Sequence, residues 1–216
     1  MRHLSPRLLR CAAALALAGG CFGAQAGNQI YEPLAASVRA ALHAAVSDQA
    51  PPDTRFTRSP ERARWLDEMS RRLARRMPDE AGRLEFLRAV HYEATRAGLD
   101  PQLVLGLIQV ESGFKKYAIS PVGARGLMQV MPFWVRSIGT PDHNLFDLTT
   151  NLRYGCTILR HYLDIERGNL FRALGRYNGS LGRAEYPNLV VGAWKANWQW
   201  QPPASLNRTT WQSARP

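Results

Sequence analysis

The sequence predicts a mostly α-helical protein that folds as one compact domain, and three observations support this prediction. Apolar residues recur at spacings of three and four, as in Leu66, Met69 and Leu73, which is the period of an amphipathic helix. Helix start and stop signals separate these stretches, and alternating strand patterns are nearly absent. A chain of 216 residues with 45% hydrophobic content is long enough to bury one core.

The first 26 residues have the pattern of a secretory signal peptide. Three arginines lie at its basic start, Arg2, Arg7 and Arg10. An apolar stretch at 11–18 follows, and Ala24-Gln25-Ala26 supplies the small residues of a cleavage site. The apolar stretch is shorter than the roughly 20 residues that span a membrane. We therefore expect export to the periplasm with cleavage after Ala26, and the alternative is a buried N-terminal helix.

Prolines, glycines and capping residues mark the ends of the expected helices. Pro78 ends one helix because proline cannot continue it, and Gly98 permits the turn that ends the next. Asp100 followed by Pro101 is a helix start, because Asp caps free backbone N–H groups and Pro fits the first turn. The segment 113–126, rich in Gly and Pro, is expected to be a loop. The expected helices are 34–46, 60–77, 79–97, 101–112, 133–138, 149–163, 171–177 and 189–200, with a further helical piece at 127–130.

These elements divide the chain into four parts. Residues 1–26 are the expected signal peptide, and residues 27–59 form an N-terminal segment that ends in a proline-containing linker. Residues 60–200 form the helical domain. Residues 201–216 have little apolar pattern and are expected to be a loose tail.

The net positive charge of the chain indicates an anionic partner but does not identify which one. Loss of the signal peptide lowers the formal charge from +11 to +8, because three arginines and no acid leave with it. A basic exported protein suits an anionic polymer, such as cell wall, lipid head groups or nucleic acid. The cluster of Arg71, Arg72, Arg75 and Arg76 favours a solvated helix face.

Cysteine and histidine usage argues against thiol and metal chemistry. Cys11 and Cys21 lie in the predicted signal peptide, and lipid attachment at Cys21 is less favoured because Ala18-Gly19-Gly20 lacks a large aliphatic side chain. Cys156 would then be the remaining cysteine, and its apolar neighbours predict a small buried side chain. The five histidines form no HExxH pattern. We expect no metal and no cofactor.

Glu111 is the residue most suited to acid–base chemistry. It follows Ile108 by three residues, Leu107 by four and Val104 by seven, so all four lie on one face of the most apolar helix of the chain. Burial and the negative helix end both favour the protonated carboxyl and raise its pKa. A carboxylic acid kept neutral near pH 7 is able to protonate a leaving oxygen. The alternative is that the helix end frays and Glu111 turns to solvent.

A partner carboxylate for Glu111 is missing from the pattern. Most glycosidases pair two carboxylates about 5–10 Å apart. The next acids, Asp142 and Asp147, follow some thirty residues later, and Asp147 has the position of a helix N-cap. If chemistry occurs here, Glu111 must carry both proton transfers, with help from the substrate.

Three blocks of the sequence resemble a known enzyme family. Glu111-Ser112-Gly113-Phe114 is followed by Ser120-Pro121-Val122-Gly123-Ala124-Arg125-Gly126-Leu127-Met128-Gln129-Val130-Met131-Pro132 and by Tyr177-Asn178-Gly179. Over about residues 84–195 the chain resembles lytic transglycosylases of the soluble (SLT) type, relatives of goose-type lysozyme. The resemblance implies a single lysozyme-like helical domain with a substrate groove, and makes residues 60–200 the catalytic domain.

The resemblance also implies a reaction. The β-1,4 bond between N-acetylmuramic acid (MurNAc) and N-acetylglucosamine (GlcNAc) of peptidoglycan is cleaved without water, and the muramyl 6-hydroxyl closes on C1 to leave a 1,6-anhydro end. Glu111 protonates the leaving oxygen and then removes the proton of the 6-hydroxyl. The substrate's N-acetyl oxygen stabilises the positive centre between these steps.

The same resemblance assigns roles around Glu111. Ser112 holds local backbone and substrate polar groups, Met128 forms an apolar floor for the sugar, and Gln129 offers its amide. Tyr177 orients Glu111 through its hydroxyl, and Asn178 bonds the N-acetyl group or backbone. Each residue also fits an ordinary structural position, such as core for Met128 and Tyr177 or a helix-end hydroxyl for Ser112.

Some details remain open or depart from the family pattern. Phe114, Tyr117 and Phe133 are candidates for stacking on sugars and fit the core equally well. Arg176 stands where the family usually has a small apolar residue, and Gly-Ser-Leu-Gly replaces the commoner Ala-Gly-x-Gly after Asn178.

Three other functions are alternatives to a lytic transglycosylase. A hydrolytic lysozyme would use water in place of the 6-hydroxyl. A non-catalytic wall-binding or secretion-apparatus protein would not need Glu111. A nucleic-acid binder rests on charge alone, and the export signal argues against it. We expect peptidoglycan glycan strands as the partner of a monomer, with envelope or secretion-system proteins as further candidates.

Overall fold

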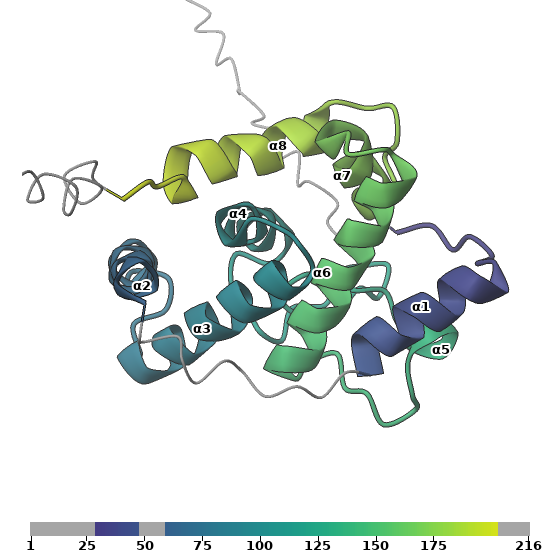
Figure 1. The fold of residues 1–216 in the computed structure, drawn as a ribbon, viewed down its shortest axis with the longest axis horizontal. Helices are drawn as coiled ribbons and strands as arrows, with labels where there is room; N and C mark the ends of the chain where they lie inside the picture. The colour runs from purple at the N-terminus through teal and green to yellow at the C-terminus, as the bar shows by residue number, and fades with distance from the viewer. Residues whose placement is uncertain (1–28, 48–58, 203–216) are drawn as a thin grey trace, which may run out of the picture.

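The computed structural model describes residues 29–47 and 59–202, and every regular element in these ranges is a helix (Figure 1). The helices are α1 (Ala36–Ser47), α2 (Pro60–Leu73), α3 (Glu80–Arg96), α4 (Pro101–Glu111), α5 (Phe133–Ile138), α6 (Leu148–Ile165), α7 (Leu170–Asn178), α8 (Glu185–Ala193) and the π-helix η2 (Trp194–Trp198). The prediction of a mostly helical fold is confirmed. The predicted signal peptide, the linker at 49–53 and most of the predicted tail lie outside the described residues.

Local capping explains where several helices begin and end. The side chains of Asp79, Asp100 and Asp147 each accept a hydrogen bond from a backbone N–H in the first turn of the helix that follows. The predicted caps at Asp100 and Asp147 are therefore confirmed. Gly98 has φ +67°, and the next N–H, that of Leu99, bonds back to the carbonyl of Ala94 at 2.8 Å.

Two expectations about helices need correction. The segment 127–130 is not helical, because Gly126 and Gln129 have φ of +76° and +48°, which a right-handed helix does not allow. It lies instead in an irregular loop where Arg125 forms isolated antiparallel bridges with Ile119 and Val130. The last helix begins at Glu185, four residues earlier than expected, and its final turn widens into η2.

Helix α4 lies at the centre of the packing, as its apolar sequence predicted. It contacts α8, η2 and α3, and in Figure 1 it runs beneath α8. Leu105, Leu107 and Ile108 have no exposed surface. Between α3 and α6, the buried Arg153 guanidinium bonds the Glu93 carboxylate at 2.8 Å, so the two charges neutralise each other inside the protein.

Part of the N-terminal segment packs on the helical domain. Leu42 and Val46 of α1 belong to the hydrophobic core, and α1 contacts α5 and α6. The His43 ring hydrogen-bonds the carbonyl of Ile138 at 3.0 Å. Residues 29–47 are therefore continuous with the core of the domain, whereas the predicted boundary at 59/60 stays a prediction.

Two further properties concern the described residues as a whole. Cys156 is buried, and burial raises the pKa of its thiol well above the usual range, as expected of a small buried side chain. Among residues 29–47 and 59–202, no helix has both the length and the apolar character needed to cross a bilayer.

Gly106 allows α4 and η2 to lie unusually close. A Cβ atom at this position would lie 2.9 Å from the backbone N and Cα atoms of Trp194. Such contacts are far below van der Waals separation, so one helix would have to move. The glycine in the middle of α4, unfavourable for an isolated helix, is therefore required by packing.

We expect Gly106→Ala to lower the free energy of unfolding by about 1–3 kcal/mol, because the added methyl overpacks the α4–η2 contact. Gly192→Ala is the matched control, since nothing lies within 4 Å of a Cβ built there. Helix propensity should make that change neutral or stabilising by up to about 1 kcal/mol. Chemical denaturation of both variants measures the difference, and equal stability would contradict the close-approach explanation.

Candidate active site

Glu111 is the last residue of α4 and is 5% exposed. Its neighbours on the same face, Leu107 and Ile108, have no exposed surface. The alternative of a frayed helix end turned to solvent is therefore wrong, and the predicted burial is confirmed. A carboxyl group withdrawn from water in this way depends on nearby hydrogen-bonding groups.

Tyr186 supplies such a group from another helix. It is the second residue of α8, is 4% exposed, and its hydroxyl donates a short hydrogen bond to Oε1 of Glu111. Burial, followed by the neighbouring Glu111 charge, raises the pKa of Tyr186 well above its usual range. The phenol therefore keeps its proton and remains a donor to the carboxyl.

The sequence did not single out Tyr186. Its position before Pro187 marks no more than a helix start. The contact joins residues 75 positions apart, and no periodic pattern carries that pairing.

Tyr177 does not make the contact that the resemblance implied. Its side chain is fully buried on α7, and its hydroxyl donates to the backbone carbonyl of Met128 at 2.7 Å. Burial, and then the charge of Glu111, raise the pKa of Tyr177 well above its usual range. The expectation that Tyr177 orients Glu111 through its hydroxyl is thus corrected: Tyr186 makes that bond, and Tyr177 holds the loop before α5.

Met128 and Gln129 are turned inward in this loop. Met128 is fully buried and packs so closely on α6 that a Cβ on Gly155 would lie 2.3 Å from its sulfur. It therefore has no exposed surface to offer as a floor for a sugar. Gln129 is 2% exposed, and its amide nitrogen donates to the carbonyls of Gly126 at 2.9 Å and Ala118 at 3.2 Å. That nitrogen already holds the loop together.

Asn151 of α6 supports the loop from beneath. Its Nδ2 donates to the carbonyls of Arg125 at 2.9 Å and Leu145 at 2.7 Å, and its Oδ1 accepts from the N–H of Met128 at 2.8 Å. A single buried amide thus bonds three backbone groups of irregular segments, although the Arg125 carbonyl also accepts from the N–H of Val130 at 3.0 Å. Local sequence pattern carries no signal for this role, because Asn151 stands within an amphipathic helix.

Gln29 supports the same loop from the N-terminal segment. It is 4% exposed, its Oε1 accepts from the N–H of Met131 at 3.1 Å, and its Nε2 donates to the carbonyl of Gln129 at 3.3 Å. The amide also interacts with the hydroxyl of Tyr177. The first described residue of the chain is therefore part of the environment of the candidate site.

Ser112 and Asn178 differ in which atoms of their side chains already have hydrogen-bond partners. The Ser112 hydroxyl donates to the carbonyl of Ile108 at 3.2 Å, so it caps the end of α4. Asn178 donates through Nδ2 to the Ser180 hydroxyl at 3.1 Å. Its Oδ1 is buried and accepts no hydrogen bond from the described residues. The residue as a whole is partly exposed, and its Nδ2 carries a second N–H beyond the one donated to Ser180.

The aromatic candidates separate into core and surface. Phe114 is buried and makes edge-on contacts with Phe86 and Trp198, so it belongs to the core. Tyr117 is 72% exposed and lies beside Phe146, with 6.0 Å between ring centroids. Phe133 is half-buried, with the Tyr31 ring against it.

The arginine that departs from the family pattern has partners of its own. Arg176 pairs with Glu166, and its second guanidinium nitrogen lies 3.2 Å from Glu32. It therefore ties the N-terminal segment to α7. Within the described ranges, no three His, Cys, Asp or Glu side chains are grouped so as to hold a metal ion.

In comparison with known protein families, residues 88–193 match the transglycosylase SLT domain. The chain is 36% identical over 106 residues to the transglycosylase of Enterobacteria phage PRD1, covering 49% of this chain and 39% of the phage protein. It is 33% identical over 114 residues to membrane-bound lytic murein transglycosylase C of Haemophilus influenzae (strain PittEE), covering 45% of this chain and 32% of that relative. The chain thus spans well under half the length of these relatives.

A solved structure is also similar over part of the chain. It is an inactive mutant of the lytic transglycosylase Slt from Pseudomonas aeruginosa, 26% identical, with a TM-score of 0.40. The similarity covers 49% of this chain and 20% of that one.

We expect Asn151→Ala to lower the free energy of unfolding by at least about 2 kcal/mol, because it leaves buried backbone groups of the loop unsatisfied. Asn144→Ala is the control: this exposed side chain makes one comparable contact, accepting from the N–H of Phe146 at 3.0 Å. Its effect should stay below about 1 kcal/mol. Urea denaturation compares the two, and an Asn151→Ala protein as stable as Asn144→Ala would contradict the assigned role.

Proposed function

We propose that the chain is a peptidoglycan lytic transglycosylase with Glu111 as its single acid/base, and the match of residues 88–193 to the transglycosylase SLT domain supports this proposal. The observation that carries the proposal is the buried Glu111 carboxyl at the end of α4, bonded by the hydroxyl of Tyr186. A carboxyl group in this setting is suited to giving up a proton and taking it back.

The proposed reaction needs one proton carrier. Glu111 protonates the oxygen between MurNAc and GlcNAc, the C1–O bond breaks, and the GlcNAc-bearing chain leaves as an alcohol. The substrate's N-acetyl oxygen stabilises the positive charge at C1. The muramyl 6-hydroxyl then bonds to C1, and its proton returns to Glu111. Water is not consumed, and the enzyme ends in its starting state.

The acids considered as partners have other positions. Asp147 accepts from the N–H of Thr150 at 2.9 Å and so caps α6. Asp142 is exposed in a turn. Substrate assistance in place of a second carboxylate fits this arrangement.

Tyr186 is proposed to position Glu111. Its hydrogen bond holds Oε1 of Glu111, so the orientation of the carboxyl group is fixed and Oε2 has a defined position. The hydroxyl also stabilises the carboxylate formed after the first proton transfer. Because the raised pKa of Tyr186 keeps its proton in place, this support persists throughout the reaction.

The remaining predicted site residues divide into two proposed groups. Asn178 is proposed to contact substrate, because the residue is partly exposed and its Nδ2 carries a second N–H beyond the one donated to Ser180. Ser112 and Gln129 are proposed to shape the mouth of the groove. Met128 and Tyr177 are proposed to hold the loop rather than touch the sugar.

Product mass separates the proposed enzyme from a lysozyme. A transglycosylase leaves 1,6-anhydro ends that are lighter by one water than hydrolytic ends. Mass spectrometry of products from purified peptidoglycan is therefore the deciding experiment. A non-catalytic wall-binding protein would release no products.

The cell envelope is the proposed site of action. The Haemophilus relative is named membrane-bound and murein-cleaving. We propose export to the periplasm through residues 1–26, with lipid attachment at Cys21 as the less favoured route. Peptidoglycan glycan strands are the proposed partner of a monomer. Envelope or secretion-system proteins remain further candidates, and nucleic acid is not proposed.

We expect Glu111→Gln to lower the rate of product release by at least about 100-fold, because an amide cannot replace a general acid. The thermal unfolding midpoint should stay near that of the wild type, since the side chains are nearly isosteric. Glu85→Gln, an exposed change on α3, is the matched control and should keep full activity. Product release by Glu111→Gln at the control's rate would remove Glu111 from the mechanism.

We expect Tyr186→Phe to lower kcat roughly 10- to 100-fold and to move the alkaline limb of the pH–rate profile to higher pH. The sign follows because a donor to the carboxylate favours its ionised form, so losing that donor retains the proton at higher pH. Tyr154→Phe is the control, since it also removes a buried hydroxyl that bonds the His143 ring at 2.7 Å. Tyr154→Phe should change the stability of the protein and leave its pH–rate profile unchanged. Identical pH–rate profiles for the wild type and both variants would refute a positioning role of Tyr186.

A further inference from the structure

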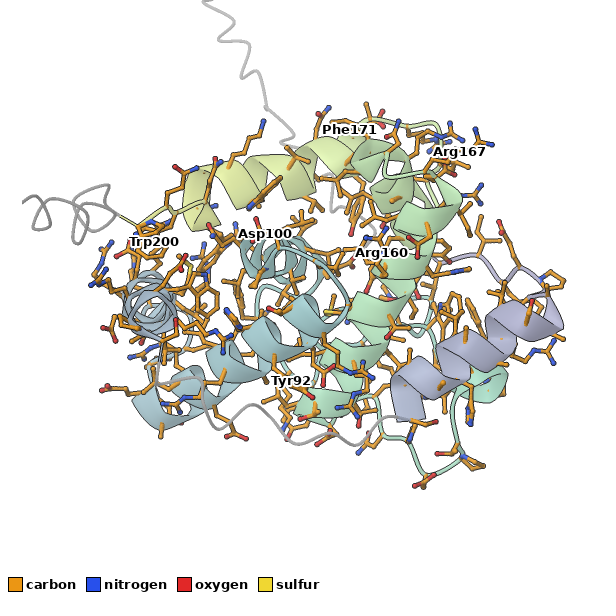
Figure 2. All side chains as sticks on the ribbon, viewed as in Figure 1. Tyr92, Asp100, Arg160, Arg167, Phe171 and Trp200 are labelled. Carbon is orange, nitrogen blue, oxygen red and sulfur yellow. The ribbon has the colours of Figure 1, made fainter. Side chains whose placement is uncertain are left out.

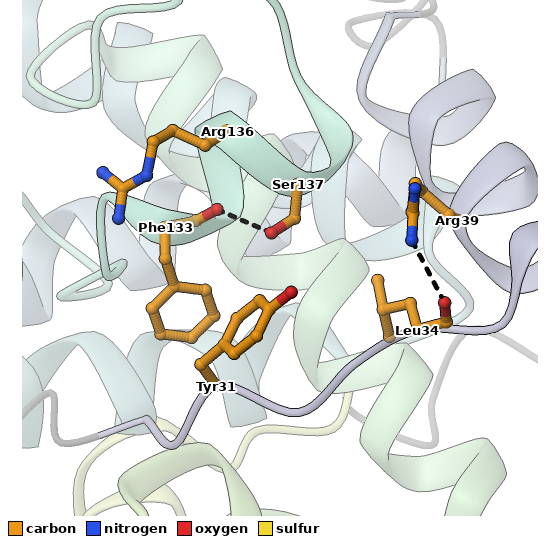
Figure 3. Close-up of a pocket in the computed structure, with 6 residues that line it drawn as sticks. All are labelled: Tyr31, Leu34, Arg39, Phe133, Arg136 and Ser137. Carbon is orange, nitrogen blue, oxygen red and sulfur yellow. Dashed lines mark hydrogen bonds between the residues drawn. The ribbon is translucent and has the colours of Figure 1, made fainter.

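A cavity of about 540 Å³ lies between the N-terminal segment and α5 (Figure 3), and Glu111 is not among the residues that line it. It is lined by Tyr31, Leu34, Arg39, Phe133, Arg136 and Ser137. Half of these residues come from the N-terminal segment, outside the SLT-matched residues 88–193.

The charge of this cavity is positive. In Figure 3 the Arg136 guanidinium lies on the Phe133 side and the Arg39 guanidinium on the Leu34 side. Arg39 donates to the carbonyl of Leu34 at 3.3 Å, which uses one of its five N–H groups. Among residues 29–47 and 59–202, no carboxylate lines the cavity. The adjacent acid in the sequence, Glu32, pairs with Arg176 at 3.2 Å.

The cavity also has an amphipathic aromatic wall. The Tyr31 and Phe133 rings meet edge to face, with centroids 5.5 Å apart and an interplanar angle of 84°. Tyr31 is 58% exposed, and its hydroxyl points toward the space between the two arginines (Figure 3). Ser137 donates to the carbonyl of Phe133 at 2.8 Å, so the polar groups left for a ligand are the phenol and the guanidiniums. Such a wall suits a ligand with both aliphatic and anionic parts.

The position of the cavity connects it to the candidate active site. Gln29 hydrogen-bonds the backbone of Gln129 and Met131. Tyr31 follows Gln29 by two residues, and Phe133 follows Met131 by two residues. Two residues of extended chain span at most about 7 Å. The cavity therefore adjoins the loop that carries Gln129.

We propose that this cavity binds the carboxylate-bearing peptide stem of peptidoglycan while the glycan lies at Glu111. The inference rests on the proposed function. A stem of four residues extends about 13 Å and carries several carboxylates, so it is able to reach from the muramyl sugar into a neighbouring cavity. The guanidiniums bind its carboxylates, and the aromatic wall packs on its aliphatic parts.

A binding experiment tests the cavity independently of catalysis. The probe is the synthetic stem L-Ala-γ-D-Glu-meso-diaminopimelate-D-Ala, titrated calorimetrically into the full chain. We expect saturable binding that weakens with salt, at least about tenfold weaker for Arg39→Gln/Arg136→Gln, and weaker for wild type with a stem whose carboxylates are amidated. Arg88→Gln, an exposed change on α3, is the matched control and should bind like wild type.

Two results of that titration would overturn the proposal. One is no binding by the wild type, and the other is equal affinity of the double variant and the control. A third arm uses phosphatidylglycerol vesicles. If they bind through the two arginines while the stem does not bind, the cavity faces a lipid surface and the proposal fails.

Kinetics on two substrates separates this inference from the proposed function. One substrate is glycan with stems, and the other is glycan from which an amidase has removed the stems. We expect the double variant to raise KM about tenfold on the first and to leave the second unchanged. If the wild type cleaves neither, the proposed function fails and the titration still tests the cavity. If the wild type cleaves both and the variant matches it on both, the cavity proposal fails alone.

Discussion

The hydrogen bond between Tyr186 and Glu111 joins α8 to the end of α4, and the arrangement of the domain depends on keeping this pair together out of water. A carboxyl in an apolar environment is unfavourable unless hydrogen bonds replace its lost hydration. The donor must therefore come from a helix that packs closely on α4. Gly106 permits that approach, because the backbone of Trp194 occupies the space of a side chain. Figure 2 shows how densely side chains fill the region between α4 and the helices around it.

The loop after α4 is the second part of the site, and it is irregular by necessity. Its backbone groups do not belong to a helix, so side chains from elsewhere satisfy them. Asn151 does so from α6, Tyr177 from α7 and Gln29 from the N-terminal segment. Residues that are conspicuous in the motif, such as Met128, thus face the interior. A motif read from sequence combines residues that meet substrate with residues that hold those residues in place.

Much of this arrangement is predictable from local pattern. The helices follow from apolar period and caps, and the burial of Glu111 follows from Leu107 and Ile108 on its own face. Tyr186 and Gln29 were missed because each contact spans 75 residues or more and leaves no trace in local periodicity. The false helical piece at 127–130 has a similar origin. Gln129 adopts φ +48°, which is rare for a residue other than glycine and is imposed here by its surroundings.

The N-terminal segment contributes residues to the surroundings of the candidate site. Residues 88–193 contain Glu111, Tyr186 and Asn178, so the proposed chemistry lies within the segment that matches the SLT domain. Gln29 and Tyr31 come from outside it, yet one supports the catalytic loop and the other lines a basic cavity beside it. A segment that packs at the edge of the candidate site is able to add contacts with a ligand without disturbing the buried Glu111. Ligand recognition is then free to vary with the flanking sequence, while the proposed proton donor stays fixed by the packing of α4 against α8.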